Sequence, residues 1–243
     1  MKQALLNLAG RLGYTILPTW RQPGLPLATL TREILARHRI DLIVDVGANA
    51  GQYRDFLRDE VFWIGDIVSF EPQSDMVELL ERRSTNDDKW KILNLALGSE
   101  ERLLSLNVMA MSSFTSFLEP DNAATPQFSD WNKVAKTEVV QVSRLDKVAL
   151  PFEGKRLLLK LDTQGFDREV FRGSSGILDN IFAIQTEIPV EKIYKGLPHY
   201  AEILLELETI GFAPAGFFPV TRAADCSAIE FDCLLVKKDM LTK

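Results

Sequence analysis

The sequence predicts an α/β fold with a mostly parallel sheet whose two faces are both covered by helices. Short apolar runs rich in β-branched residues alternate with segments of helical periodicity along most of the chain, and this is the pattern of a parallel sheet. The first of these runs ends in a glycine-containing turn at 47–51, as a strand does when a helix follows it directly. The length of 243 residues suits one domain of this kind.

The first half of the chain predicts N-terminal helices, followed by three strands that are separated by helices. Prolines and Gly24 break the regular pattern between the first two helices. The strand candidates are short, apolar and followed closely by Gly47, Pro72 and Gly98. The expected elements are helices at 1–17 and 29–39, a strand at 41–46, a helix at 52–58, a strand at 67–71, a helix at 74–83 and a strand at 90–97.

The alternation of strands and helices is interrupted in the middle of the chain. Residues 101–110 and 137–142 have strand patterns with no helix between them, and the stretch 119–131 is polar. We expect a hairpin-like insertion whose long loop is either a plain surface loop or a lid. The expected elements after it are a strand at 156–162, a helix at 167–171, a strand at 181–187, a helix at 200–210 and a terminal strand pair at 217–220 and 230–237. Residues 1–40 are expected to form a helical extension packed on the core, and 41–243 a single domain.

Composition argues against several classes of protein. The net charge of -6 disfavours a protein that mainly binds nucleic acid, because neutralising phosphates needs a basic surface. The sequence contains no run of about 18 apolar residues, so no membrane span is predicted. The N-terminus lacks the long apolar region of a secretory signal. Two cysteines form neither a disulfide framework nor a zinc site. We therefore expect a cytoplasmic location and no metal, while the oligomeric state is not indicated.

The turn after the first strand is the strongest candidate for a ligand-binding loop. Gly47 and Gly51 allow unusual φ angles and a close approach of the backbone to a ligand, and the following helix offers free N–H groups. Asn49 stands where a dinucleotide-binding loop has its second glycine, so a pyrophosphate is disfavoured. Asp45 can accept hydrogen bonds from an ammonium group. A ligand with both an amine and a carboxylate, such as the methionine end of S-adenosylmethionine, therefore suits the loop.

The ends of the second and third strands supply further candidates for contacts with the cofactor. Glu71 ends the second strand, where a carboxylate can bind both hydroxyls of a ribose. Asn94 and Ala96 lie at the end of the third strand, where they could meet the adenine edge. Tyr53, on the helix after the glycine turn, and Pro72, which stops the second strand, complete the predicted cofactor-binding set.

The strand at 156–162 carries the candidate catalytic group. Asp162 stands at its carboxyl end, beside the expected ligand crevice, and could accept the proton of a substrate hydroxyl. Glu187 ends the next strand and is the reserve candidate; a close carboxylate pair would either raise one pKa or bind a cation. Asp167, on the following helix, could serve only as a cap or an ion-pair partner. Residues 111–114 and Trp131 are candidates for lining the acceptor site.

Four motifs together resemble the FkbM family of methyltransferases in their order and spacing. The resemblance covers residues 41–236, most of the chain, and its one mild departure is Asp167 in place of a more usual glutamate. It implies a Rossmann-like class I methyltransferase fold with a seven-stranded, mostly parallel sheet and S-adenosylmethionine as cofactor. The motifs are DVGANAG at 45–51, FEP at 70–72, NLALG at 94–98 and LKLDTQGFD at 159–167.

The resemblance also implies roles for individual residues. Asp45, Gly47, Asn49 and Gly51 would bind the methionine moiety, Glu71 would bind the ribose, and Asp162 would face the cofactor. The expected activity is methylation of a hydroxyl on a sugar or another small natural product, by in-line transfer to a small-molecule or glycan acceptor. Two alternatives stay open: an inactive, methyltransferase-like binding module, and a nicotinamide-dependent oxidoreductase on a similar fold.

Overall fold

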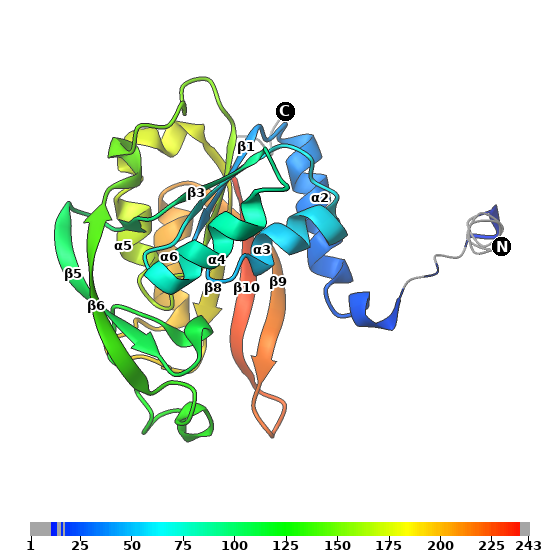
Figure 1. Ribbon diagram of the computed structural model, residues 1–243. Helices are drawn as coiled ribbons and strands as arrows, with labels where there is room; N and C mark the ends of the chain where they lie inside the picture. The colour runs from blue at the N-terminus through cyan, green and yellow to red at the C-terminus, as the bar shows by residue number, and fades with distance from the viewer. Residues whose placement is uncertain (1–10, 14–15, 17, 239–243) are drawn as a thin grey trace.

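The central sheet of the computed structural model contains seven strands in the order β3-β2-β1-β7-β8-β10-β9 (Figure 1). The structure describes residues 11–13, 16 and 18–238. The five strands from β3 to β8 run parallel, whereas β10 is antiparallel to both of its neighbours. The strand bounds are β1 Leu42–Val46, β2 Asp66–Phe70, β3 Trp90–Leu93, β7 Leu157–Leu161, β8 Ile181–Pro189, β9 Phe212–Arg222 and β10 Ala228–Lys237. The predicted seven-stranded, mostly parallel sheet is therefore confirmed.

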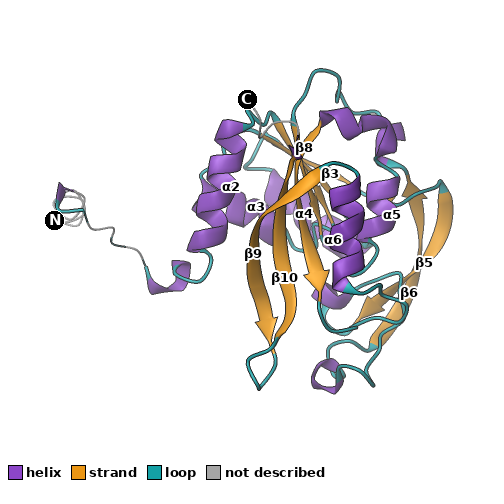
Figure 2. Ribbon diagram, turned by 180° about the vertical axis from the view of Figure 1, so that it is seen from behind, coloured by secondary structure: helices purple, strands orange, loops and turns teal. Residues whose placement is uncertain are grey.

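Helices cover both faces of this sheet (Figures 1 and 2). The side chains of each strand alternate between the two faces, because the side-chain repeat of a strand is two residues. In β1, Ile43 packs into the cluster that includes α2, α3 and α4 side chains, while Leu42 and Val44 pack into the cluster on the α5 and α6 side. The helix bounds are α2 Leu25–Arg37, α3 Gln52–Asp55, α4 Ser74–Ser84, α5 Asp167–Arg172 and α6 Tyr200–Thr209. A π-helical turn, Phe56–Val61, continues α3.

The middle of the chain forms a second, three-stranded sheet in the order β4-β6-β5. Strands β5 (Arg102–Met109) and β6 (Val134–Ser143) pair antiparallel, which confirms the predicted hairpin-like insertion. Figure 1 shows them in green, to the side of the main sheet. The connection 110–133 is an irregular segment that contains two short 3-10 turns, Ser112–Phe114 and Pro126–Phe128.

The prediction of a single third strand at 90–97 is wrong. Residues 90–93 form β3 of the main sheet, whereas Ala96–Leu97 form β4, which pairs with β6 of the insertion. The amide of Leu95 bonds to the carbonyl of Leu93, so the chain turns out of the main sheet there. The local pattern predicts strand correctly on both sides of the turn. Which sheet each part joins is decided by its pairing partners, and these lie far along the chain.

The chain ends in a long hairpin of β9 and β10 at the edge of the main sheet (Figure 1). Pro214 and Pro219 lie in β9, and this is permitted because an edge strand need not donate every backbone N–H. The hairpin extends beyond the ends of the neighbouring strands in Figure 2. This extension carries Val220, Thr221 and Glu230 to the rim of the main cavity.

The helical segment before β1 packs on the core. Ala28, Ile34 and Leu35 of α2 are buried in the same cluster as Ile43 of β1. The helix begins at Leu25, four residues before the expected start, with Pro26 in its first turn. Most of the helix expected at 1–17 lies outside the described residues, and the division at residue 40 stays a prediction. Within the described part of the chain, no helix is both long and apolar enough to cross a bilayer.

Candidate functional site

A cavity of about 580 Å³ opens at the carboxyl ends of β1, β2, β7 and β8. Ligands of open α/β sheets bind at this edge of the sheet, and the volume lies within the range typical of small-molecule sites. One end of the cavity is formed by the glycine loop that follows β1. The insertion and the terminal hairpin form its other walls.

The glycine loop is packed so tightly against the end of β7 that Gly47 has no room for a side chain. A Cβ at this position would lie 1.9 Å from the backbone oxygen of Asp162, and φ is +83°. The amides of Gly47 and Ala48 both donate to the carbonyl of Phe70 at the end of β2. Gly51 is also left-handed, with φ +88°. The sequence-based reading of a glycine-dependent turn agrees with this geometry.

A row of buried polar side chains crosses the main sheet beneath the cavity. Ser69, Asp45, Lys160 and Gln185 occupy paired positions on four neighbouring strands. Ser69 donates to Oδ2 of Asp45 over 2.8 Å, and Lys160 Nζ lies 3.2 Å from Oδ1. Asp45 is fully buried and does not line the cavity. Its carboxylate is therefore engaged inside the protein, where it holds Lys160 in place.

Lys160 connects the two carboxylates on either side of it. Its Nζ lies 3.1 Å from Asp162 Oδ2 and donates to the carbonyl of Gly47 over 3.4 Å. Burial lowers the pKa of Lys160, but the carboxylates of Asp162 and Asp45 outweigh burial, so the net shift is upward. Lys160 therefore carries a positive charge at neutral pH, and it lines the cavity.

Glu71 lies at the carboxyl end of β2, buried, with both carboxylate oxygens facing backbone amides. Oε2 accepts from the amide of Asn49 over 2.7 Å, and Oε1 accepts from the amide of Gln73 over 2.9 Å. Burial raises the pKa of Glu71 to about 7, although these two hydrogen bonds act in the opposite direction. The structure thus brings Glu71 and Asn49 together at one wall of the cavity, as the sequence predicts.

The other predicted cofactor-binding residues divide into those that line the cavity and one that does not. Tyr53, Pro72 and Ala96 line it. Asn94 is not among the lining residues, and its side-chain amide donates to the carbonyls of Glu71 and Pro72 over 3.1 and 3.2 Å. Asn94 therefore holds the chain that carries Glu71 rather than presenting its amide to the cavity.

The part of the cavity lined by residues at the ends of β7, β8 and β10 is strongly acidic. Asp162 and Glu187, both expected from the sequence, are joined there by Glu230 and Asp232 of β10. Burial raises the pKa of Glu187 well above its ordinary value, and the nearby charge of Asp162 adds to the shift. Burial raises the pKa values of Glu230 and Asp232 as well. No group of three or more His, Cys, Asp or Glu side chains within residues 11–13, 16 and 18–238 has the arrangement of a metal site.

Aromatic side chains from the insertion line the same cavity as these carboxylates. The rings of Phe114 and Phe128 lie 5.4 Å apart, and Trp131 lies 6.5 and 6.3 Å from them. All three line the cavity together with Met111, and Trp131 is 48% exposed. We call Phe114, Phe128 and Trp131 the aromatic wall. Sequence reasoning placed residues 111–114 and Trp131 here but did not identify Phe128.

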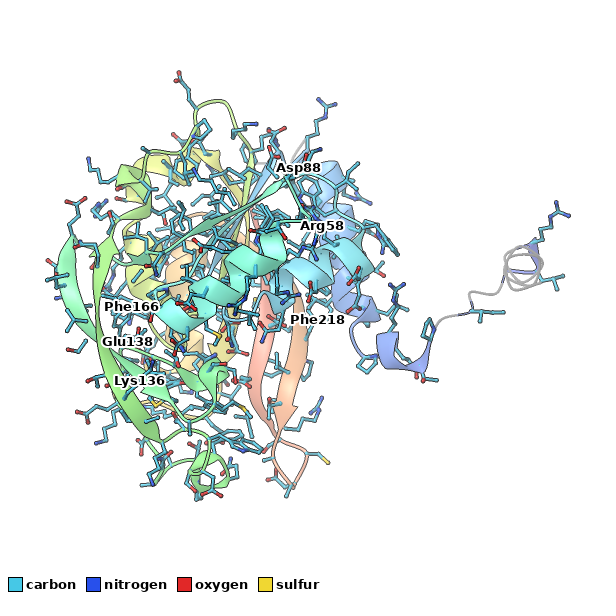
Figure 3. The ribbon with its side chains drawn as sticks, viewed as in Figure 1. Arg58, Asp88, Lys136, Glu138, Phe166 and Phe218 are labelled. Carbon is cyan, nitrogen blue, oxygen red and sulfur yellow. The ribbon has the colours of Figure 1, made fainter. Side chains whose placement is uncertain are left out.

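The loop 162–167 that carries Asp162 is held in shape by contacts within the loop, with β8 and with the insertion. Asp167 accepts from the amide of Thr163 over 2.8 Å and from the hydroxyl of Thr186 over 3.1 Å. Phe166, labelled in Figure 3 beside the insertion, packs on Phe117 with ring centroids 4.8 Å apart. Asp167 thus ties the loop to β8, and Phe166 ties it to the insertion.

Besides Glu230 and Asp232, sequence reasoning missed the polar residues Lys160, Gln164, Gln185 and Tyr194. One signal was present for Lys160, because a charged residue inside the apolar strand 157–161 must have a buried partner. Gln185 lies in a similar position in β8 and accepts from Tyr53 over 2.9 Å. Nothing in the local pattern marks Tyr194, which reaches the site from a loop after β8.

Comparisons with known proteins give one family match and several structural likenesses. A family model described as the methyltransferase FkbM domain matches residues 45–214. The chain resembles the FkbM methyltransferase structure from Methylobacillus flagellatus KT with a TM-score of 0.50 and 13% identity, over 81% of this chain and 43% of that one. It also matches a SAM dependent methyltransferase structure from Aquifex aeolicus with a TM-score of 0.47 and 14% identity, over 90% and 94% of the two chains.

At these identities, the likeness to the solved structures speaks for the fold alone. This chain spans less than half of the Methylobacillus protein's length, and no curated protein matches it. The family model covers most of the chain, includes the glycine loop, Glu71 and Asp162, and confirms S-adenosylmethionine as the cofactor. The resemblance seen in the sequence is therefore confirmed, and this chain belongs to the FkbM family of methyltransferases.

Proposed function

We propose that this protein transfers a methyl group from S-adenosylmethionine to a hydroxyl of a sugar or another small natural product. The observation that carries the proposal is one continuous cavity with two different ends. The glycine loop and Glu71 lie at one end, and the aromatic wall faces carboxylates at the other. Asp162 follows β7 between the two ends, and its side chain is 39% exposed.

The residues at the first end fit the cofactor. Gly47 presents bare backbone that no side chain could replace, and Asn49 Oδ1 is buried without a donor in the described part of the chain. Glu71 has the position of a ribose ligand. When bound, S-adenosylmethionine supplies an already activated methyl group, so the protein needs to align the acceptor and exclude water.

The residues at the second end fit a polyhydroxylated ring. The aromatic wall offers apolar faces against which the flat side of a sugar can pack, and Trp131 is partly exposed to receive it. The opposite carboxylates, Glu187, Glu230 and Asp232, can accept hydrogen bonds from hydroxyls. This combination of an apolar surface with a few convergent polar groups is typical of small-molecule sites.

Asp162 is the proposed base that takes the proton of the acceptor hydroxyl. Lys160 lies 3.1 Å from its Oδ2 and compensates the negative charge. Glu187 suits this role less, because burial raises its pKa and keeps it protonated to higher pH. Glu187 therefore stays the reserve candidate, as a hydrogen-bonding partner of the acceptor.

The proposal is tested with Asp162→Asn and a panel of monosaccharides, glycosides and hydroxylated small molecules, using S-adenosylmethionine labelled in the methyl group. We expect kcat to fall by about 10²–10⁴-fold in the variant, with cofactor affinity within a factor of about three of wild type. Asp88→Asn, an exposed residue next to Asp87, is the matched control. Near-native turnover of Asp162→Asn would exclude Asp162 as the base.

The same experiment separates the remaining alternatives. A binding module would hold S-adenosylmethionine without transferring label to any acceptor, and an oxidoreductase would bind NADH in its place. Asn49, at φ +46°, occupies the position of the second glycine in a dinucleotide-binding loop, and this argues against binding of NADH.

We also propose a cytoplasmic location for the protein, because Cys226 is an exposed free thiol and Cys233 is a buried free thiol.

A further inference from the structure

The side chain of Gln164 lies between the two carboxylates of the acceptor site. Its Nε2 donates to Asp162 Oδ1 over 3.0 Å and to Glu187 Oε2 over 3.1 Å. An amide nitrogen has two protons, so one group can serve both carboxylates at once. Gln164 thereby joins the end of β7 to β8 across the floor of the cavity.

The backbone of Gln164 has a conformation that favours glycine over a residue with a side chain. Its φ is +52°, in the left-handed region, and Gly165 follows at +92°. Glycine adopts this conformation without strain, whereas glutamine adopts it only with strain. The loop therefore retains a residue that its backbone disfavours, and the contacts of the side chain supply the physical reason.

Two contacts from other elements hold Gln164 in this position. The hydroxyl of Tyr194 lies 2.8 Å from Gln164 Oε1, which can accept its proton and so fix the direction of the amide. Ser116 of the insertion donates to the backbone carbonyl of Gln164 over 2.7 Å. With Oε1 turned toward Tyr194, Nε2 is directed at Asp162 and Glu187.

We propose that Gln164 is a positioning residue of the methyl-transfer site, holding Asp162 and Glu187 together through one amide that Tyr194 orients. The inference rests on the proposed function, because it assigns Asp162 as the base. The amide donates to both carboxylates and stabilises the ionised form of Glu187. It opposes the repulsion that would otherwise move Asp162 away from the acceptor.

Several acidic groups face Glu187 and act against this stabilisation. Asp162, Glu230, Asp232 and Asp167 each contribute a like charge, and burial adds the largest effect on the pKa of Glu187. Tyr194, from the loop after β8, also interacts electrostatically with Glu187. Removing the Gln164 amide from this surrounding should raise the pKa of Glu187 further.

The first test measures the titration of Glu187 by carboxyl ¹³C NMR in the full-length protein, which requires no acceptor. Assignment uses Glu187→Gln. In Gln164→Met, which keeps the side-chain length but has no donor, we expect the midpoint to rise by about one pH unit. In Gln141→Met, an exposed glutamine of β6, we expect no shift. A Gln164→Met midpoint equal to wild type would overturn the inference.

The second test separates positioning from folding. Gln164→Gly removes the amide and also relieves the left-handed backbone, so we expect Tm to stay the same or rise. We expect kcat for the best acceptor of the panel to fall at least tenfold, with unchanged affinity for S-adenosylmethionine and an acidic limb of the kcat profile displaced to higher pH. Tyr194→Phe should show a smaller change in the same direction. Wild-type kcat in Gln164→Gly would overturn the inference.

The two tests distinguish failure of this inference from failure of the proposed function. If wild type methylates no hydroxyl acceptor but Gln164→Met still shifts the Glu187 midpoint, the positioning role stands and the proposed function fails. If Asp162→Asn abolishes transfer while the Gln164 variants keep both wild-type kcat and the wild-type midpoint, the proposed function stands and the positioning role is wrong.

Discussion

At the scale of single residues, the site contains charged side chains that are buried away from water. Glu71 is 5% exposed, and burial raises its pKa to about 7. In the ribose-binding role proposed for Glu71, the diol donates its hydroxyl protons, so it binds best to the ionised carboxylate. Cofactor affinity should therefore depend on pH in a range where most glutamates are already fully ionised.

We expect the Kd for S-adenosylmethionine to rise roughly tenfold between pH 8 and pH 6, because about one tenth of Glu71 is ionised one unit below its pKa. The direction follows from a raised pKa, since the binding-competent form is lost as the pH falls. Isothermal titration calorimetry at constant ionic strength measures this change. Glu71→Gln should bind weakly at every pH; a variant that retains the tenfold dependence would assign it to another group.

Lys160 carries the second prediction at this scale. Asp45 is fully buried, and its charge is compensated by Lys160 at 3.2 Å. We expect Lys160→Met to lower the free energy of unfolding by about 3–5 kcal/mol, because an unpaired buried carboxylate remains. The double variant Asp45→Asn with Lys160→Met should recover part of this loss. Urea unfolding measures both, and a loss in the double variant as large as the two single losses combined would contradict the pairing.

At the scale of elements, the loop after β1 and the loop after β7 form one unit. The backbone of Gly47 touches the carbonyl of Asp162, and the amide of Asp162 donates to the carbonyl of Val46 over 3.0 Å. The cofactor loop and the proposed base thus have a fixed separation that neither loop sets alone. This coupling explains why the glycine is required by the neighbouring strand as well as by the turn.

Gly47→Ala should therefore cost more stability than another left-handed glycine. A Cβ at Gly47 meets backbone at 1.9 Å, whereas a Cβ at Gly196, with φ +80°, meets nothing within 4 Å. We expect a loss of about 2–5 kcal/mol for Gly47→Ala and about 1–2 kcal/mol for Gly196→Ala. Chemical denaturation gives both values. Equal losses would show that φ alone, and not the contact with β7, requires Gly47.

The insertion is attached to α4 by polar contacts at the surface. Lys136 Nζ lies 2.8 Å from Asp75 and 2.9 Å from Glu138, and Figure 3 labels Lys136 and Glu138 on the insertion. Exposed ion pairs contribute little to stability, about 0–1 kcal/mol. The insertion is therefore held against the rest of the molecule mainly by buried contacts such as that of Phe117 with Phe166.

At the scale of the whole molecule, the buried carboxyls of the cavity make folding depend on pH. Burial raises the pKa values of Glu71, Glu187, Glu230 and Asp232 above those of the unfolded chain. The folded protein then binds more protons than the unfolded chain, so the free energy of unfolding falls as the pH rises through the folded pKa values. The carboxyls with lowered pKa values, such as Asp87 and Asp146, act only at more acidic pH.

We accordingly expect Tm to decrease from about pH 5 to about pH 8. Differential scanning fluorimetry across this range measures the slope, and Glu187→Gln should make it shallower because one titrating group is removed. Glu153→Gln, an exposed residue of the loop before β7, is the control and should leave the slope unchanged. A Tm that rises with pH in this range would mean that ion pairs dominate over burial.

Much of the fold follows from local patterns. The apolar runs at β1 and β7 identify buried parallel strands, because only strands covered on both faces carry no polar alternation. The glycine turn, Glu71 and Asp162 follow from their places at strand ends. Segments whose partners lie far along the chain were harder to predict. The pattern at 94–97 predicts a continuation of β3, whereas in the structure residues 96–97 form β4 and pair with residues 142–143.

The sequence by itself determined the α/β class, the family, the glycine loop and the strand-end carboxylates, because each depends on residues close together in the chain. Only the tertiary structure decided what surrounds them. Glu230 and Asp232 reach the cavity through the antiparallel pairing of β10 with β8. Gln164 meets Glu187 and Tyr194 through contacts between separate elements. Hydrogen bonding and burial between distant segments depend on how strands are ordered in the sheet, and the spacing of residues along the chain does not record that order.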